Sequence, residues 1–313
     1  MINLILQYRD FERDVLNHWT ICISKYYHLR KLELYLKEKK WDFTVYDIEL
    51  QDILSFITKL KTTPIANRWH KNGKYLCEGS IFIYLCDIRM FFKYLNILWY
   101  KLKFNWEQIP IYRCPDKKRE PMNKGDYEKL RIAPLLYADS YLEWIRDQLL
   151  IDIPRETWLR RAEIVRLKFE DFHQDGRQFQ ILVKWGRYEN VFVSEQLKNR
   201  ILNFEKQLKI AYPYIVWNYV ISHIKIRDRW RWFTPDMASL VVHKYVKILQ
   251  NKGELNKHLT LHQTRHSFAM RCVYSGLSQQ ATMKLMRHKH PESTLQYYHL
   301  NDNRLQNQYD MIK

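Results

Sequence analysis

The sequence from Leu259 to Leu300 is LTLHQTRHSFAMRCVYSGLSQQATMKLMRHKHPESTLQYYHL. Its HQTR segment places His262 and Arg265 three residues apart, so on a helix both side chains lie on one face. His288 follows, and Tyr297 comes nine residues after it. Groups that can bind a phosphate therefore precede a tyrosine hydroxyl. This combination is suited to cutting a phosphodiester with a protein nucleophile.

Cleavage of a phosphodiester by transesterification needs a nucleophile, neutralisation of the non-bridging oxygens, and groups that move protons. Arginine suits the neutralising role because its planar fork pairs with two phosphate oxygens and stays protonated. Two arginines on one phosphate could do the work of a metal ion. An isolated HxxR pair is more often two unrelated surface side chains, so the interpretation depends on the surrounding residues.

The surrounding residues resemble a known family. The segments HQTRHSFAMRCVYSGLS and LMRHKHPESTLQYYHL are similar to those of tyrosine recombinases, which include phage-type integrases and Xer-type recombinases. Members have an HxLRHSFAT-like helix, an LGH-like turn, and a tyrosine nine residues beyond that histidine. The resemblance implies that Tyr297 is the nucleophile, followed by the family's Y-x-H ending. It also makes His262 and Arg265 the middle pair and His288 the late histidine.

The family also has an arginine in a TGLR-x-x-E-like helix, which the segment TWLRRAE matches. The resemblance makes Arg160 the first arginine and Glu163 a buried carboxylate that supports the basic site. It further implies a β-hairpin lysine that protonates the leaving 5′ oxygen, and Lys184 in ILVKWGRYENVFV is the best match. Because this hairpin departs from the usual GKG turn, Arg187 and the more distant Lys168 are alternatives.

Three positions depart from the family pattern. Trp158 replaces the glycine of TGLR, Arg287 replaces the glycine before the late histidine, and Ser194 stands where proline is common. The first two put bulk beside catalytic positions, where the local backbone could differ from that of relatives. No departure removes a reacting group. The match extends from Asp126 to Tyr298, and the N-terminal third fits the family's DNA-clamping domain in pattern only.

A metal site is one alternative for the same histidines. His288 and His290 lie two apart near a tyrosine, as in metal-dependent HUH nucleases, and His299 offers a third ligand. The residue between the first two is lysine, and no strand pattern surrounds them. Cys272 is too far along the chain for usual zinc-site spacing. We therefore expect no metal and no cofactor, and a surface or DNA-contacting role for His290.

Tyr298 is an alternative nucleophile because it adjoins Tyr297. Adjacent helical residues point about 100° apart, so only one of the two can face the site. The nine-residue spacing from the late histidine favours Tyr297.

Other function classes share parts of this pattern. A non-catalytic DNA-binding protein could use the same scaffold, but all seven family positions are present. A type IB topoisomerase or a telomere resolvase would use the same chemistry. The chain length and the HxxR helix favour a site-specific recombinase or integrase. It would act through a 3′-phosphotyrosyl intermediate and a Holliday junction, as part of a mobile element or in a related process.

The charge balance indicates a polyanionic partner. The chain carries a formal net charge of +18, and its first 121 residues hold 21 Lys and Arg against 14 Asp and Glu. The remaining residues hold 31 against 20, so both halves are basic. We expect double-stranded DNA as the partner. The candidate backbone contacts are Arg68, Lys71, Lys74, Arg89 and Arg187.

Other features bound the cellular setting. The five cysteines are widely spaced and odd in number, which favours free thiols in a reducing compartment. The N-terminus meets charge too early for a signal peptide, and no apolar run is long enough for a membrane span. We expect a cytoplasmic protein, associated with the nucleoid if the host is bacterial.

Apolar periodicity predicts helices over 27–40, 47–60 and 80–98, then a proline-rich basic linker. We assign residues 1–112 to a helical core-DNA-binding domain, 113–125 to the linker, and 126–313 to the catalytic domain with a tail over 300–313. In the catalytic domain we expect helices near 126–133, 140–151, 157–168, 195–210, 235–250, 262–275, 278–287 and 292–298, with three short strands over 169–172, 179–184 and 188–193.

The predicted fold is mainly α with a small antiparallel β-sheet, arranged as a two-domain C-shaped DNA clamp. The family resemblance implies four protomers on two DNA sites, with the C-terminal segment exchanged between neighbours. Accessory DNA-bending proteins are further partners consistent with it.

Overall fold

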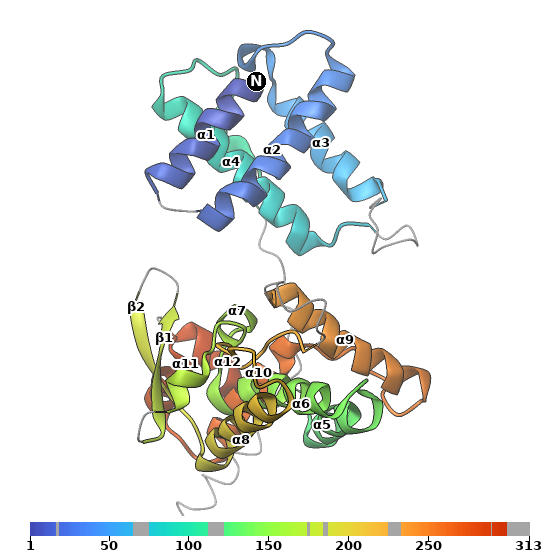
Figure 1. Ribbon diagram of the computed structural model, residues 1–313. Coiled ribbons are helices and arrows are strands. Elements are labelled where there is room, and N and C mark those ends of the chain that lie inside the picture. The colour runs from blue at the N-terminus through green and yellow to red at the C-terminus, as the bar shows by residue number, and fades with distance from the viewer. Residues whose placement is uncertain are drawn as a thin grey trace, which may run out of the picture. The chain divides into compact units, whose positions relative to one another are not determined.

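The computed structural model describes residues 1–16, 19–64, 75–111, 122–173, 176–183, 187–224, 233–288 and 290–298 (Figure 1). The chain forms two compact units, Met1–Lys117 and Lys118–Lys313, and each has its own hydrophobic core. The boundary falls inside the predicted linker 113–125, most of which lies outside the described residues.

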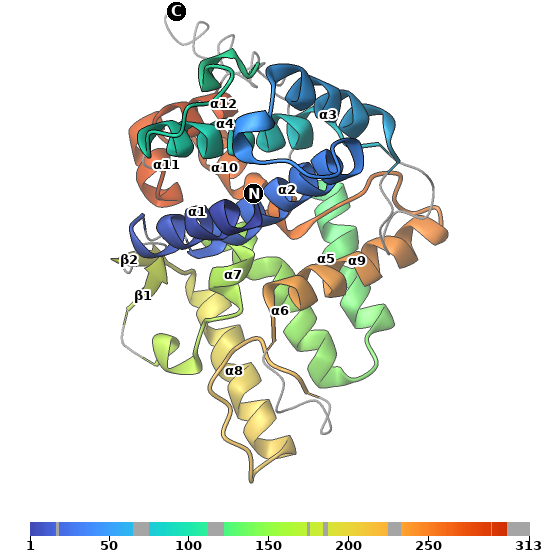
Figure 2. The same ribbon diagram turned by 90° about the horizontal axis from the view of Figure 1, so that it is seen from above.

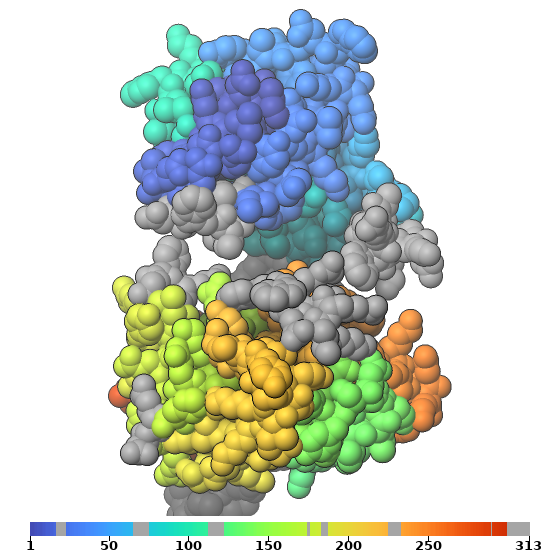
Figure 3. Space-filling view, in the orientation of Figure 1, coloured from blue at the N-terminus to red at the C-terminus, as the bar shows by residue number. Residues whose placement is uncertain are grey.

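The first unit is helical. It contains α1 (Ile2–Asp14), α2 (Trp19–Lys39), α3 (Leu50–Thr62) and α4 (Glu78–Ile97), with short 3-10 turns at Val45–Asp47 and Trp106–Gln108. In α3 the apolar residues Ile53, Phe56 and Leu60 recur at helical spacing and are buried. In the space-filling view, the dark blue side chains of α1 lie directly against those of α2 (Figure 3). The three predicted helices are confirmed as α2, α3 and α4, whereas α1 was not predicted.

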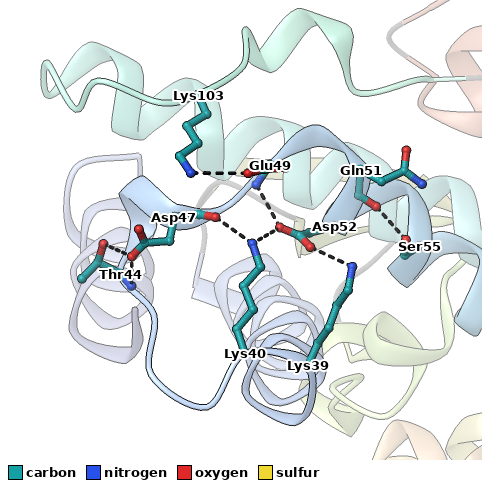
Figure 4. Close-up of polar contacts among 9 residues, drawn as sticks. All are labelled: Lys39, Lys40, Thr44, Asp47, Glu49, Gln51, Asp52, Ser55 and Lys103. Carbon is teal, nitrogen blue, oxygen red and sulfur yellow. Dashed lines mark hydrogen bonds and ion pairs between the residues drawn. The ribbon is translucent and has the colours of Figure 1, made fainter.

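The charged end of α2 is fixed to α3 by one buried carboxylate. Asp52 accepts hydrogen bonds from Lys39 at 2.9 Å and from Lys40 at 2.6 Å, and also from the Glu49 N–H at 3.0 Å (Figure 4). Burial alone would raise the pKa of Asp52, but these partners hold it at about 2. Two lysines of this basic unit are therefore already paired within the protein.

The second unit packs helices around α6. It contains α5 (Lys124–Tyr137), α6 (Tyr141–Thr157), α7 (Arg161–Ile164), β1 (Gln178–Val183), β2 (Arg187–Phe192), α8 (Glu195–Ala211), α9 (Pro235–Asn251), α10 (Leu261–Tyr274), α11 (Gln279–Met286) and α12 (Glu292–Tyr298). Helix α6 packs against α5, α8, α9 and α10 (Figures 1 and 2). The end of α6 is therefore fixed by neighbours on several sides.

Two buried carboxylates on α6 strengthen these contacts. Asp152 accepts a hydrogen bond from Tyr127 of α5 and pairs with Arg200 of α8 at 2.5 Å. Asp147 accepts a hydrogen bond of 2.6 Å from Tyr245 of α9. Buried polar groups of this kind are costly when unpaired, so they fix the register of the helices that meet them.

The region between α6 and α8 differs in part from the prediction. The sheet has two antiparallel strands, β1 and β2, with Gln178 opposite Phe192 and Val183 opposite Arg187. The predicted third strand is instead a 3-10 helix, Phe169–Phe172, because Asp171 accepts the Lys168 N–H at 2.8 Å. The helix predicted over 157–168 is reduced to α7. The mainly helical fold with a small antiparallel sheet is confirmed.

Two further observations concern the whole set of described residues. None of their helices combines the length and apolar character needed to cross a membrane. Among the described cysteines, Cys86 and Cys272 carry free thiols.

Candidate active site

Helix α10 presents the HxxR residues. The helix begins after Thr260, whose N–H donates to the Gln263 side chain at 2.9 Å in a capping box. His262 lies exposed in the first turn, whereas Arg265 is only 4% exposed. His266 follows one turn after His262 and meets it edge to face, with ring centroids 4.3 Å apart. One helix therefore brings two histidines and a buried arginine to the same place.

Trp158 lies directly beneath Arg265. It ends α6 in the left-handed conformation with φ 59°, and its N–H donates to the Pro154 carbonyl at 3.2 Å. The guanidinium carbon of Arg265 lies 4.2 Å from the Trp158 ring centroid, a cation–π geometry. Burial lowers the pKa of Arg265 to about 9, and repulsion from Arg160 adds to this effect. The guanidinium is still protonated at neutral pH.

Glu163 joins two arginines from different segments. Its carboxylate accepts the Arg160 N–H at 2.8 Å, the Arg160 Nη1 at 3.1 Å and the Arg287 Nη2 at 3.0 Å. Burial alone would raise the pKa of Glu163, but Arg287 and Arg160 hold it below its ordinary value. Arg287 Nε also lies 3.8 Å from Glu189 of β2, so the hairpin borders this cluster.

His288 enters the site immediately after α11. Its Nδ1 is hydrogen-bonded to Thr294 Oγ1 at 2.8 Å, and its ring meets Trp158 edge to face with centroids 5.4 Å apart. Burial lowers the pKa of His288 to about 4, and the charges of Arg265 and Arg160 contribute to that shift. The imidazole is therefore neutral at pH 7 and acts as a hydrogen-bonding group, not as a cation.

The two adjacent tyrosines of α12 face different surroundings. Tyr297 is 3% exposed, and its hydroxyl is hydrogen-bonded to His266 Nδ1. Tyr298 points elsewhere: its hydroxyl donates to the Leu277 carbonyl at 2.7 Å and lies 2.7 Å from Thr282 Oγ1. Of the two hydroxyls, the one on Tyr297 therefore lies among the histidines of the candidate site.

The predicted general acid falls outside the described residues. Lys184 comes one position after the last residue of β1 in the sequence, and the described part of the hairpin reaches the site through Glu189. Of the alternatives, Arg187 is the exposed first residue of β2, and Lys168 forms an ion pair of 2.8 Å with Glu170. The assignment of Lys184 stays a prediction.

Of the candidate DNA contacts in the first unit, only Arg89 on α4 is described. Its guanidinium carbon lies 5.1 Å from the Trp106 ring centroid, and Lys93 Nζ lies 5.2 Å from the same ring. This stacking holds both cations in place. The other three candidates are outside the described residues: Arg68, Lys71 and Lys74.

The described residues do not show the histidines of the alternative metal site gathered around one point. His290 is exposed and His288 is bonded to Thr294, while His299 lies outside the described residues. Within the described ranges, no three His, Cys, Asp or Glu side chains are close enough to hold a metal ion.

Sequence reasoning missed three contributors to the site. The sequence signal for His266 is its place one turn after His262. Trp158 and Arg287 stand out in the sequence only as replacements of family glycines. Both adopt the left-handed backbone that glycine favours, with φ 59° and 55°. The glycine-type backbone is therefore kept, and two large side chains are added inside the site.

The sequence model of the phage integrase family matches residues 131–304, more than half of the chain. The chain belongs to the phage integrase family. The matched range includes every described residue of the candidate site, from Trp158 to Tyr297. This match confirms the predicted membership of the tyrosine recombinase family.

Relatives similar to this phage integrase family member are named tyrosine recombinases. The tyrosine recombinase XerD of Listeria innocua serovar 6a is 26% identical over 269 residues, which cover 84% of this chain and 82% of the relative. The tyrosine recombinase XerC of Histophilus somni (strain 2336) is 24% identical over 311 residues, covering 93% and 96% respectively.

Solved structures agree with the fold. The Tn1549 transposon integrase in complex with a circular intermediate DNA aligns with TM-score 0.70 at 17% identity, covering 95% of this chain and 93% of that one. A lambda integrase dimer bound to a COC′ core site aligns with TM-score 0.67 at 14% identity, covering 94% and 76%. The predicted site-specific recombinase is confirmed at family level, and the topoisomerase, telomere-resolvase and non-catalytic alternatives are not favoured.

Proposed function

We propose that this integrase-family enzyme cuts and rejoins double-stranded DNA with Tyr297 as its nucleophile. One observation carries the proposal: side chains from α10, from α12 and from the segment between α11 and α12 meet around the indole of Trp158, the residue that ends α6. The Trp158 ring centroid lies 4.2 Å from the Arg265 guanidinium carbon, 5.4 Å from the His288 ring and 6.1 Å from the Tyr297 ring. Residues distant in sequence therefore lie together, which supports their joint action on one phosphate.

In the proposed reaction the Tyr297 oxygen attacks the scissile phosphorus. A tyrosyl O–P bond forms and the P–O5′ bond breaks, which leaves a 3′-phosphotyrosyl link and a free 5′ hydroxyl. The tyrosine proton passes to His266, whose Nδ1 the hydroxyl already contacts. Lys184 protonates the leaving 5′ oxygen. The reverse attack by a 5′ hydroxyl restores the phosphodiester, so no external energy source is needed.

Charge on the phosphate is met by the basic cluster. Arg160 and Arg265 pair with the non-bridging oxygens as negative charge builds up in the pentavalent state. The exposed imidazole of His262 and the neutral imidazole of His288 add hydrogen bonds. Glu163 keeps Arg160 oriented through its two hydrogen bonds.

At the level of assembly, we propose that the two units close on a DNA duplex as a clamp. Four protomers then hold two sites and exchange strands through a Holliday junction, with residues 300–313 docking on a neighbour. The formal net charge of +18 supports a DNA partner. Accessory bending proteins, a mobile-element origin and a place at the nucleoid in the cytoplasm belong to the same proposal.

The decisive experiment traps the covalent complex on a nicked duplex, from which the short cleaved strand diffuses away. We expect wild-type protein to form a protein–DNA adduct and Tyr297→Phe to form none while still binding DNA. Tyr298→Phe is the matched control, because it removes a hydroxyl bonded to Leu277 and Thr282, outside the histidine cluster. An adduct formed by Tyr297→Phe would contradict the assignment.

A further inference from the structure

Arg287 holds a costly position in the molecule. It follows α11 with φ 55° and ψ 42°, a left-handed conformation that side chains other than glycine and asparagine rarely adopt. Its side chain is only 6% exposed, so a permanent positive charge is also buried. Both features disfavour arginine unless its guanidinium does something specific there.

The described neighbours of Arg287 satisfy only some of the hydrogen-bond donors of its guanidinium. Nη2 donates to Glu163 at 3.0 Å, and Nε lies 3.8 Å from a Glu189 oxygen, beyond hydrogen-bond distance. Nε and Nη1 are buried and have no hydrogen-bond partner among the described residues. The same is true of Nη1 of Arg265. Buried donors of this kind require an acceptor.

The charge balance points to an anion as that acceptor. Arg160 and Arg287 both pair with the buried carboxylate of Glu163, and the charge of that carboxylate also acts on Arg265, so three positive charges gather around it. Arg287 and Arg160 both contribute to the lowered pKa of Arg265, so the guanidiniums lie close enough to repel one another. An anion bound between Arg265 and Arg287 would satisfy the free donors and relieve this repulsion.

We infer that Arg287 is a third arginine of the phosphate site and donates directly to a non-bridging oxygen of the scissile phosphodiester. The inference rests on the proposed function and extends its two arginines to three. The pentavalent state carries one more negative charge than the ground-state diester, and the third guanidinium meets that charge. Arg287 is thus a catalytic residue that the family's glycine cannot replace.

The test compares two substrates that differ in one charge. One nicked duplex carries the natural scissile phosphodiester, and the other carries a methylphosphonate, in which a neutral methyl group replaces one non-bridging oxygen. On the phosphodiester, we expect Arg287→Gly to slow adduct formation about 100-fold and Arg287→Lys to slow it roughly tenfold. On the methylphosphonate, the variants should stay within about threefold of wild type, because the charge that Arg287 neutralises is absent.

Arg287→Gly removes the left-handed strain, so its backbone is favoured, and Arg287→Asn provides a second variant that tolerates the same φ. An equal loss on both substrates would mean that Arg287 acts only by supporting Glu163 and would overturn the inference. Undiminished cleavage of the phosphodiester by Arg287→Gly and Arg287→Asn would overturn it as well. A wild-type protein that forms no adduct on either duplex would contradict the proposed function itself, and the third-arginine role with it.

Discussion

The guanidinium carbon of Arg265 lies 4.2 Å from the ring centroid of Trp158, at the residue where α6 ends in a left-handed turn. A left-handed non-glycine residue costs roughly 1–2 kcal/mol. The indole offsets this cost because it is 1% exposed and also meets the rings of His266, His288 and Tyr297. The Trp158 ring is therefore the aromatic surface against which the proposed reacting groups pack.

Replacing Trp158 by a smaller aromatic ring should slow catalysis. Trp158→Phe keeps an aromatic side chain but gives Arg265 a poorer cation–π partner, a loss of about 1 kcal/mol. That loss corresponds to roughly fivefold slower adduct formation on a nicked duplex. Rates equal to wild type would show that the stacking does not orient Arg265.

The strain at Trp158 can be separated from its packing with a matched residue. Trp99 has the same type of backbone, φ 63°, but its ring is 91% exposed. Trp99→Gly should raise the free energy of unfolding by up to about 1 kcal/mol, because only strain is removed. Trp158→Gly should lower it by about 3 kcal/mol, since a buried aromatic is lost. Urea denaturation of both variants checks the opposite signs.

Glu163 should be essential for stability because two arginines depend on it. Glu163→Gln keeps the size of the side chain but leaves Arg160 and Arg287 without their carboxylate, which should cost about 3 kcal/mol. Glu170→Gln is the matched control, since that carboxylate is 68% exposed and pairs with Lys168 at the surface. We expect the control to change stability by less than about 0.5 kcal/mol. Similar urea midpoints for the two variants would contradict this account.

Local patterns in the sequence predict much of the second unit. Helices α8 and α9 follow from apolar spacing, and each starts at a capping residue, Ser194 and Thr234. The three-residue spacing of His262 and Arg265 correctly indicated one helix, α10. Helix α1 was missed because one of its buried positions is Glu12, bonded to Tyr8 at 2.6 Å, which a hydrophobic pattern does not register.

The contacts that complete the site depend on packing and not on local pattern. His266 and Tyr297 are 31 residues apart, and their hydrogen bond exists because α10 packs against α12. The left-handed turns at Trp158 and Arg287 run against the preference of both residue types, so propensity cannot predict them. Only the tertiary structure indicates that these bulky replacements of glycine point into the site.

His266 should matter for removing the proton of Tyr297. His266→Gln can still bond to the Tyr297 hydroxyl but cannot accept its proton, so adduct formation at pH 7 should fall about 100-fold. The residual rate should then rise with pH, as hydroxide takes over the role. His262→Gln serves as the comparison, because its loss of a phosphate contact should not change the pH profile. If His266→Gln forms the adduct at the wild-type rate and that rate does not depend on pH, the imidazole does not accept the tyrosine proton.

The buried imidazole of His288 should make stability depend on pH. Its pKa is about 4 in the folded protein against an ordinary value of 6.5, so between these values only the unfolded chain binds the proton. The contribution of His288 to the free energy of unfolding should therefore be fully present above pH 6.5. It should be lost progressively as the pH drops towards 4. His288→Gln should flatten this part of the curve. Urea midpoints measured from pH 7.5 to 4.5 test it, and parallel curves for the two proteins would contradict the prediction.

The general acid can be identified by changing the leaving group of the DNA substrate. Lys184→Ala should slow cleavage of a normal duplex by about 100-fold, because the 5′ oxygen then departs without a proton. A 5′-bridging phosphorothioate leaves as a thiolate, which needs no proton, so the variant should regain nearly wild-type rates on that substrate. Arg187→Ala and Lys168→Ala are the matched controls, and we expect neither to show this selective rescue. If one of them is rescued instead of Lys184→Ala, the proton comes from that residue, and the hairpin turn has lost the role that its sequence predicts.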